Sequence, residues 1–316
     1  MISVIIPTRN PHPGRLAQAL AGLAAQTVPS SDWEVVLVDN GSDVPLTKTA
    51  LACLPVATRV VREPSTGLTP ARLAGINAAR GDVLVFVDDD NVLDRGYLTA
   101  VEHAFAVRPT LGAAGGPVAP IWETTPPEWT REYHGLLALR DLGPELRIAR
   151  GGGKAPWPDF APVGAGLAVR RYHALAYAEA VARDPRRSRL DRSGGNLASG
   201  GDNDLVFTTL HAGGDVGYLP DLGLRHLIPV SRLQPTYLAR LNRGIMRTWV
   251  QVLALHGQCP WPAISRVSVP LRAARAYLRA RAWRGPAERV RWAGVLGQFE
   301  GQADSAHAFA ERPLHM

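Results

Sequence analysis

The sequence predicts an α/β fold with a mostly parallel, doubly wound sheet, followed by a helical extension towards the C-terminus. Short β-branched runs alternate with helical segments through the first 90 residues, a pattern typical of parallel strands joined by right-handed crossovers. Further along, long helical segments follow prolines, as expected where proline occupies the first turn of a helix. These two observations place the sheet early in the chain and the helices late.

Four early strands are expected, and the first of them is a β-branched run typical of a strand buried on both faces. They cover residues 2–7, 34–38, 57–61 and 83–87. Helices are expected at 15–25 and at 69–80, the second capped by Thr69. Later elements are expected as a helix at 203–213, strands at 216–219 and 224–228, and helices at 235–256, 267–284 and 287–300.

Polar clusters follow three of the early strands. They are Thr8-Arg9-Asn10, Asp39-Asn40 and Asp88-Asp89-Asp90. In an open parallel sheet, ligands bind at the carboxyl ends of the strands. The three clusters therefore predict a binding site on one edge of the sheet.

The run Asp88-Asp89-Asp90 directly follows five apolar residues. Three adjacent carboxylates repel one another, and a cation relieves that repulsion. Oxygen ligands suit Mg²⁺ or Mn²⁺, often shared with substrate phosphates. A solvated acidic turn is the alternative, but the position after a buried strand favours a metal site.

Composition excludes several classes of site. No run of eighteen apolar residues is present, and the N-terminus lacks the pattern of a signal peptide, so we expect a cytoplasmic protein. Cys53 and Cys259 are far apart and outside any CxxC pattern, which favours inert thiols over a disulfide or zinc site. No glycine-rich segment has the spacing of a P-loop or a Rossmann fingerprint.

Several motifs, in their order along the chain, resemble the family 2 glycosyltransferases of bacterial polysaccharide biosynthesis. They are residues 3–8, 34–42, 67–72 and 86–90, then 163–170, 200–205, 226–229 and Arg232. The resemblance covers roughly residues 1–235. It implies a GT-A fold, an inverting reaction, a divalent metal (Mn²⁺ or Mg²⁺) and a UDP-, GDP- or dTDP-sugar donor, with a UDP-sugar favoured.

The resemblance also assigns donor-binding residues. Pro7, Thr8 and Arg9 match the pocket for the nucleotide base, and Asp39 matches the acid that accepts a hydrogen bond from the base. Arg72 lies in the helix that covers the nucleotide, although a surface helix arginine is the alternative.

The metal and the diphosphate are assigned in the same way. Asp88 and Asp90 match the DxD-type pair, with Asp90 as the direct ligand, Asp88 nearer the ribose or a metal-bound water, and Asp89 behind them. His226 matches a late metal ligand, with a structural histidine as the alternative. Arg232 is placed to reach the diphosphate, since arginine pairs well with phosphate oxygens.

Asp202 matches the general base that takes the proton of the acceptor hydroxyl. The usual Glu-Asp pair is altered here, because Gly201 occupies the position of the glutamate. Asp204 is the competing candidate for the base. A helix N-cap is the structural alternative for Asp202.

Three regions are expected. Residues 1–232 would form the catalytic domain, with the nucleotide sugar bound by about 1–116 and the acceptor by 117–232. Residues 233–301 would form a helical region and 302–316 a loosely ordered tail. The acceptor is expected to be a saccharide or a lipid-linked sugar.

Two other function classes match parts of the sequence. A sugar-nucleotide nucleotidyltransferase would carry a glycine-rich loop after its first strand, and Thr8-Arg9-Asn10-Pro11 lacks the glycines. A nucleic-acid-binding module is suggested by the net charge of +7, but it would not need an acid triplet at the edge of a sheet. The transferase is therefore favoured, with no nucleic-acid partner.

Arginines concentrate near the C-terminus, where Glu288 is the one acid among eight of them. They are Arg266, Arg272, Arg275, Arg279, Arg281, Arg284, Arg289 and Arg291. Within 267–284 an apolar row recurs at helical spacing. This segment is either a packed helix with a solvated basic face, or a peripheral contact with the anionic inner face of a membrane.

Overall fold

The computed structural model describes residues 1–310, with side chains described up to Ser305. The chain divides into two compact units. We call the first the sheet unit; it contains Met1–Glu123, Ala138–Ser188 and Asp202–Ile228. We call the second the helical unit; it contains Thr124–Leu137, Arg189–Gly201 and the chain from Pro229 onward.

The main sheet has eight strands in the order β3-β2-β1-β4-β9-β6-β10-β8. Their bounds are β1 Ile2–Thr8, β2 Trp33–Asp39, β3 Ala57–Arg62, β4 Val83–Phe86, β6 Leu111–Gly115, β8 Arg147–Ala149, β9 Ala168–Arg170 and β10 Asp215–Tyr218. The four strands predicted from the first 90 residues are mutually parallel neighbours, whereas β8 and β9 run antiparallel to their neighbours. The predicted mostly parallel sheet is confirmed.

A second sheet has three strands in the order β5-β11-β7. Their bounds are β5 Asn91–Leu93, β7 Val118–Trp122 and β11 Leu224–Ile228. β5 directly follows the acid triplet and pairs antiparallel with β11. This pairing connects the end of β4 to a late segment of the chain.

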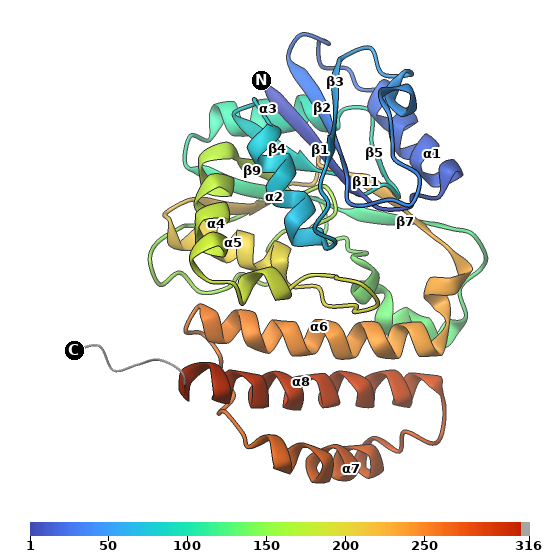
Figure 1. Ribbon diagram of the computed structural model, residues 1–316, viewed down its shortest axis with the longest axis vertical. Helices are drawn as coiled ribbons and strands as arrows, with labels where there is room; N and C mark the ends of the chain where they lie inside the picture. The colour runs from blue at the N-terminus through green and yellow to red at the C-terminus, as the bar shows by residue number, and fades with distance from the viewer. Residues whose placement is uncertain (311–316) are drawn as a thin grey trace. The chain divides into compact units, whose positions relative to one another are not determined.

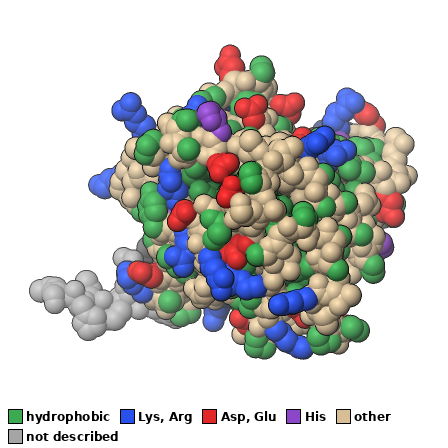
Figure 2. Space-filling model, turned by 90° about the horizontal axis from the view of Figure 1, so that it is seen from above, with side chains coloured by type: hydrophobic (Ala, Val, Ile, Leu, Met, Phe, Trp, Pro, Cys, Tyr) green, Lys and Arg blue, Asp and Glu red, His purple; other side chains and the backbone are tan. Residues whose placement is uncertain are grey.

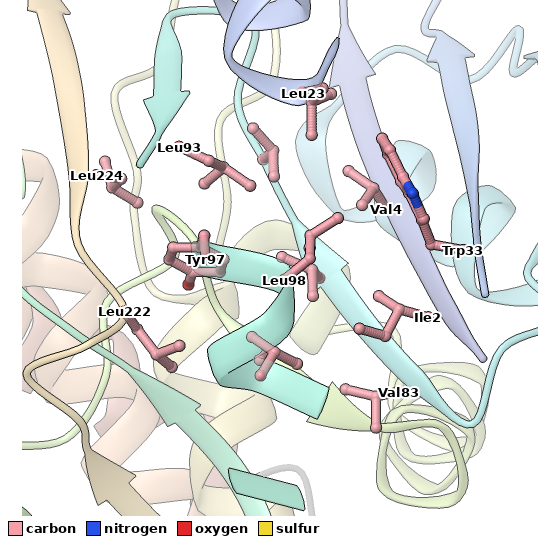
Figure 3. Close-up of a cluster of buried hydrophobic side chains, with 14 of the residues drawn as sticks. Ile2, Val4, Leu23, Trp33, Val83, Leu93, Tyr97, Leu98, Leu222 and Leu224 are labelled. Atoms are coloured by element: carbon pink, nitrogen blue, oxygen red, sulfur yellow. The ribbon is translucent and has the colours of Figure 1, made fainter. Parts of the chain in front are cut away.

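Helices cover both faces of the main sheet. Their bounds are α1 Pro13–Ala24, α2 Leu68–Ala78, α3 Tyr97–Val107, α4 Arg171–Arg183 and α5 Gly201–His211, with short 3-10 turns η1 Lys48–Leu51 and η3 Arg187–Arg189. Alternate residues of β1 enter different cores: Val4 packs with residues of α1 and α3, and Ile5 with residues of α2, α4 and α5. Figure 3 shows part of the first cluster, with Leu23 of α1 and Leu98 of α3 beside Val4. The continuous apolar runs of the sequence follow from this burial on both faces.

The start of α2 differs from the prediction. Thr69 was expected to cap the helix, but α2 begins at Leu68 and its N-cap is Gly67, at φ 146°. Residues with a side chain rarely adopt this backbone angle, so glycine is required there. Thr69 instead lies buried inside the first turn.

The helical unit contains three long helices. The bounds of its elements are η2 Glu128–Leu137, η4 Val230–Leu233, α6 Pro235–Leu255, η5 Arg266–Ser268, α7 Val269–Ala280 and α8 Pro286–Ala310. α8 packs between α6 and α7 (Figure 1). Gly297 and Gly301 allow α6 to approach closely, since a Cβ at these positions would lie 2.1 Å and 2.6 Å from backbone oxygens of α6. Among residues 1–310, no helix combines the length and the apolar character needed to cross a membrane.

The prediction of a loosely ordered tail after residue 301 is wrong up to Ala310, because α8 continues to that residue. Gln302 is buried and its side chain donates a hydrogen bond to the Pro262 carbonyl at 2.9 Å. Asp304 accepts hydrogen bonds from Arg247 at 2.7 Å and Arg266 at 2.9 Å. These polar contacts fix a segment whose weak apolar pattern gave no helical signal. Residues 311–316 lie outside the described part of the chain.

A buried histidine on α4 makes stability depend on pH. His173 is 2 % exposed and packs against Gly112 and Gly214, where an added Cβ would lie 2.9 Å and 2.3 Å from its ring. Neither ring nitrogen has a hydrogen-bond partner among the described residues. Burial, reinforced by the nearby charge of Arg170, lowers the pKa of His173 from 6.5 to about 4.

We therefore expect stability to fall as the pH falls from 6.5 towards 4. In this window the unfolded chain binds a proton at His173 and the folded protein does not, which costs about 3 kcal/mol when complete. Urea unfolding of the wild type and of His173→Leu at pH 7.5 and 4.5 measures the effect. The variant should lose less stability between the two pH values; an equal loss in both proteins would show that other groups control it.

Candidate functional site

The polar strand ends lie at one edge of the main sheet. β1 pairs in register with β2, so that Thr8 faces Asp39, and with β4 up to the pair Ile5–Phe86. The acid triplet begins two residues beyond Phe86. The Thr8 hydroxyl donates a hydrogen bond to Oδ2 of Asp89. The chain thus brings together, through Thr8, all three clusters that the sequence placed on one edge.

Asp39 is buried at the end of β2, with both carboxylate oxygens in hydrogen bonds. Oδ1 accepts the backbone N–H of Ser42 at 2.9 Å, and Oδ2 accepts that of Leu46 at 3.1 Å. Burial alone would raise the pKa of Asp39, but hydrogen bonds from Ser42 and Leu46, together with the charge of Arg62, hold that pKa below its ordinary value. A carboxylate in this environment is charged at neutral pH and orders the loop after β2.

Asn40, which was noted in the sequence only as part of a polar turn, organises the loop before α2. Its side-chain nitrogen donates to the Ser65 carbonyl at 2.7 Å, and its side-chain oxygen accepts the Gly67 N–H at 2.7 Å. Asn40 is 5 % exposed. The dipeptide Asp39-Asn40 indicated a turn. The hydrogen-bond partners of Asn40 are more than twenty residues away, so they could not be predicted from the local sequence.

The second sheet places Asp90 next to His226. Asp90 Oδ1 lies 3.5 Å from His226 Nε2, and both side chains are buried. The pair is held by the β5–β11 register, in which His226 faces Asn91, and by a backbone hydrogen bond from Leu227 N–H to the Asp90 carbonyl at 2.9 Å. The fold thereby places a carboxylate and an imidazole, from residues far apart in the sequence, next to each other.

These two side chains match part of what a divalent metal requires. Neighbouring ligands of one Mg²⁺ or Mn²⁺ ion lie about 3 Å apart, close to the observed 3.5 Å. Oxygen ligands suit either ion, and an imidazole suits Mn²⁺ better. In the described part of the chain, no group of three or more His, Cys, Asp or Glu side chains is arranged to hold a metal. The residues present therefore supply two donors, with Asp88 half-buried two residues away.

Arg72 is buried rather than exposed, so the alternative of a surface helix arginine is wrong. Its side chain is 5 % exposed and its guanidinium lies over the Phe86 ring, 5.9 Å from the ring centroid. A Cβ at Gly164 would lie 2.9 Å from Nη2 of Arg72 and 2.9 Å from Oδ2 of Asp202. Arg72 and Asp202 therefore both lie close to Gly164, where a larger residue would press against their side-chain ends.

Asp202 is half-buried in the first turn of α5. Its Oδ2 accepts the Gly164 N–H at 2.7 Å and its Oδ1 accepts the Asn203 N–H at 2.9 Å. Because α5 begins at Gly201, Asp202 is inside the helix and is not its N-cap. The partial positive charge of a helix N-terminus favours a carboxylate at this position.

Asp204, the competing candidate for the base, has a different environment. Its side chain is fully buried, and Oδ1 pairs with Arg187 Nη1 at 2.5 Å. A carboxylate held in a buried ion pair has a structural role and is poorly placed to meet an acceptor. The geometry favours Asp202 over Asp204.

Three further residues were predicted to bind the donor, namely Pro7, Arg9 and Arg232. Pro7 is buried in β1 opposite Val38. Arg9 is exposed, and its Nε donates to the Gly41 carbonyl at 3.4 Å. Arg232 lies in η4 of the helical unit, half-buried. Their roles stay predictions.

Comparison with known proteins then decides the family. The model for Glycosyl transferase family 2 matches residues 3–173, which is more than half of the chain. The chain belongs to this family. Membership of glycosyl transferase family 2 confirms the resemblance found in the sequence and makes the protein a glycosyltransferase. The sugar-nucleotide nucleotidyltransferase is therefore not retained.

Two relatives come from Rhizobium meliloti (strain 1021). The chain is 27% identical over 249 residues to the succinoglycan biosynthesis protein ExoM, covering 76% of this chain and 71% of ExoM. It is 35% identical over 103 residues to the succinoglycan biosynthesis protein ExoW, covering 31% of each.

A solved structure shares the fold. The crystal structure of S. aureus TarS is similar with a TM-score of 0.50 at 14% identity, over 95% of this chain and 54% of the TarS chain. The chain thus spans about half the length of TarS. At this identity the likeness confirms the predicted GT-A fold, and it carries nothing on substrates.

Proposed function

We propose that this glycosyltransferase moves a sugar from a nucleotide-diphosphate sugar, preferentially a UDP-sugar, to an acceptor hydroxyl with inversion at the anomeric carbon. The observation that carries the proposal is that Asp202 and Arg72 both lie close to Gly164, in the same unit as the acid-bearing end of β4. The acceptor would be a saccharide or a lipid-linked sugar, because relatives are named for succinoglycan biosynthesis. The reaction would take place in the cytoplasm or at the inner face of the membrane.

The donor nucleotide would bind at the ends of β1 and β2. Asp39, held as a charged carboxylate, would accept a hydrogen bond from the base, while Thr8 and Pro7 line the adjacent strand end. Arg9 would contact the nucleotide from its exposed position. The Thr8–Asp89 hydrogen bond couples this pocket to the acid triplet, which supports one continuous donor site.

The diphosphate would meet positive charge from several sources. Asp90, His226 and Asp88 would hold Mn²⁺ or Mg²⁺, and the ion when bound would stabilise negative charge on the departing diphosphate. Arg72 is the buried cation of the sheet unit beside the proposed base, and it would attract the same anion. Arg232 would add a further phosphate contact.

Asp202 would act as the general base. The acceptor oxygen forms a bond to the anomeric carbon while the bond from that carbon to the diphosphate oxygen breaks, and the electron pair leaves with the nucleotide diphosphate. The acceptor proton passes to a carboxylate oxygen of Asp202. The two backbone N–H groups of Gly164 and Asn203 fix the orientation of this carboxylate.

A panel of nucleotide sugars tests the proposal without knowledge of the acceptor. The protein is incubated with UDP-, GDP- and dTDP-sugars and Mn²⁺ or Mg²⁺, and release of the nucleoside diphosphate is followed. We expect slow hydrolysis of one class of donor, with UDP-sugars favoured. Hydrolysis of none, measured alongside calorimetric binding of none, would contradict the proposed donor chemistry.

A further inference from the structure

Helix α7 buries one narrow side and exposes the rest. Ala273 is its buried residue, and the Trp292 indole of α8 donates a hydrogen bond to the Ala273 carbonyl at 3.0 Å. The Tyr277 ring packs edge-on against Trp292, with centroids 5.2 Å apart. These contacts define the side of α7 that faces α8.

The apolar row identified in the sequence lies away from that side. Val267 is 88% exposed, Leu271 58% and Leu278 63%, and Ala274 between them is also exposed. The helix is packed against α8, but this apolar row is not its packed side. Since residues three and four apart share one face of a helix, Leu271, Ala274 and Leu278 form an outward apolar stripe on α7, and the exposed Val267 precedes it in η5.

A basic stripe runs next to the apolar one. Arg272, Arg275 and Arg279 are exposed and share the neighbouring face of the helix. Arg281, Arg284 and the half-exposed Trp283 continue the surface beyond the end of α7. We call this set, from Val267 to Arg284, the α7 surface.

The segment that forms the α7 surface contains no acidic residue. Between residues 262 and 287 the sequence contains six arginines and no Asp or Glu. Arg266 is paired with Asp304 of α8 at 2.9 Å. Arg275, Arg279, Arg281 and Arg284 have no ion-pair partner among the described residues. By contrast, basic and acidic side chains are interspersed on the face seen in Figure 2.

We propose that the α7 surface attaches this protein to an anionic lipid surface. The apolar stripe would enter the region between headgroups and acyl chains, and the arginines beside it would contact anionic headgroups. The exposed side chain of Trp283 would lie at the level of the headgroups, which is the position that indole rings favour in membranes. Lipid therefore matches both halves of the surface.

Two other binding partners would each use only one of the two stripes, the apolar one or the basic one. A second copy related by two-fold symmetry would bring the arginine stripes of both copies together, and a four-residue row is small for a stable interface. A nucleic acid would use the arginines and leave Leu271 and Leu278 in water. Binding to lipid does not depend on the proposed function. Only its biological role does, which would be to bring the enzyme to a lipid-linked acceptor.

Sedimentation with vesicles tests the attachment. The full chain is mixed with phosphatidylglycerol-containing or pure phosphatidylcholine vesicles at low and high salt, without donor or acceptor, so the result is independent of transferase activity. The test variant carries Leu271→Gln, Leu278→Gln, Arg275→Gln and Arg279→Gln, which preserve helix propensity. The control variant carries Val44→Gln, Val107→Gln, Arg80→Gln and Arg95→Gln, four exposed residues of the sheet unit with the same change in charge.

We expect the wild type and the control variant to bind the anionic vesicles and to be released by salt. Each arginine contributes about fivefold to affinity, so the test variant should bind at least about 20-fold more weakly. Circular dichroism must show both variants folded. Equal binding of both variants, or equal binding of the wild type to neutral vesicles, would overturn the proposal. So would absence of vesicle binding together with a dimer in sedimentation velocity, or with tight binding to duplex DNA.

Discussion

Asp202→Asn is expected to lower the turnover number by a factor of about 10² to 10⁴, the range for loss of a general base. The amide keeps the size of the side chain, and its oxygen can still accept the hydrogen bond that Gly164 donates at 2.7 Å. It cannot take the proton of the acceptor. Donor affinity should change little, since we propose that Asp202 contacts the acceptor and not the donor. Donor hydrolysis rates and calorimetric donor binding, measured on the same preparations, separate the two effects.

Asp204→Asn is the matched control, because it makes the same chemical change two residues away. Removing its charge leaves Arg187 without its partner in a buried ion pair, so we expect a lower melting temperature. Turnover per folded molecule should stay close to that of the wild type. If Asp204→Asn loses turnover and Asp202→Asn retains it, the base has been assigned to the wrong carboxylate.

Asp90→Ala is expected to weaken donor binding by at least about 100-fold, since even indirect partners of metal ligands often contribute 10- to 100-fold. The carboxylate is buried, lies 3.5 Å from His226 Nε2 and would be shared with the metal that accompanies the diphosphate. Calorimetry with a UDP-sugar, with Mn²⁺ and then with excess EDTA, measures the effect. The wild type should lose its affinity in EDTA to a similar extent.

Asp82→Ala provides the control for this experiment. Asp82 is an exposed acid before β4, and its carboxylate accepts a hydrogen bond from the N-terminal amino group at 3.4 Å. Its variant should bind the donor as the wild type does, with the same dependence on metal. If the wild type binds the donor equally well with and without EDTA, donor binding does not require a metal. That conclusion would hold whatever the affinity of Asp90→Ala.

The parallel core of the fold could be predicted from the sequence because its strands carry their signal locally. Residues 2–7 and 83–87 are predominantly apolar and β-branched, which is typical of a strand buried on both faces. The position of the acid triplet after such a strand was sufficient to predict a site at that edge of the sheet. The end of α8 carried no comparable signal, because polar contacts of Gln302 and Asp304 order it.

Other parts of the site depend on tertiary contacts that local sequence does not encode. The approach of His226 to Asp90 results from the register of β5 with β11, and the sequence suggested it only through family resemblance. The choice between Asp202 and Asp204 required their environments, since both lie in the same short segment. Periodicity likewise predicted the apolar row of α7 but could not reveal that the opposite side of the helix is the covered one.

The anomeric configuration of the sugar released on hydrolysis tests the central claim most directly. With a UDP-sugar of α configuration, water replaces the acceptor, and an inverting reaction assisted by Asp202 releases the β-sugar first. Proton NMR spectra recorded before the free sugar equilibrates distinguish the two anomers. We predict initial β-sugar with the wild type and a rate lower by about 10² or more with Asp202→Asn. Initial release of the α-sugar would contradict a single displacement at this site.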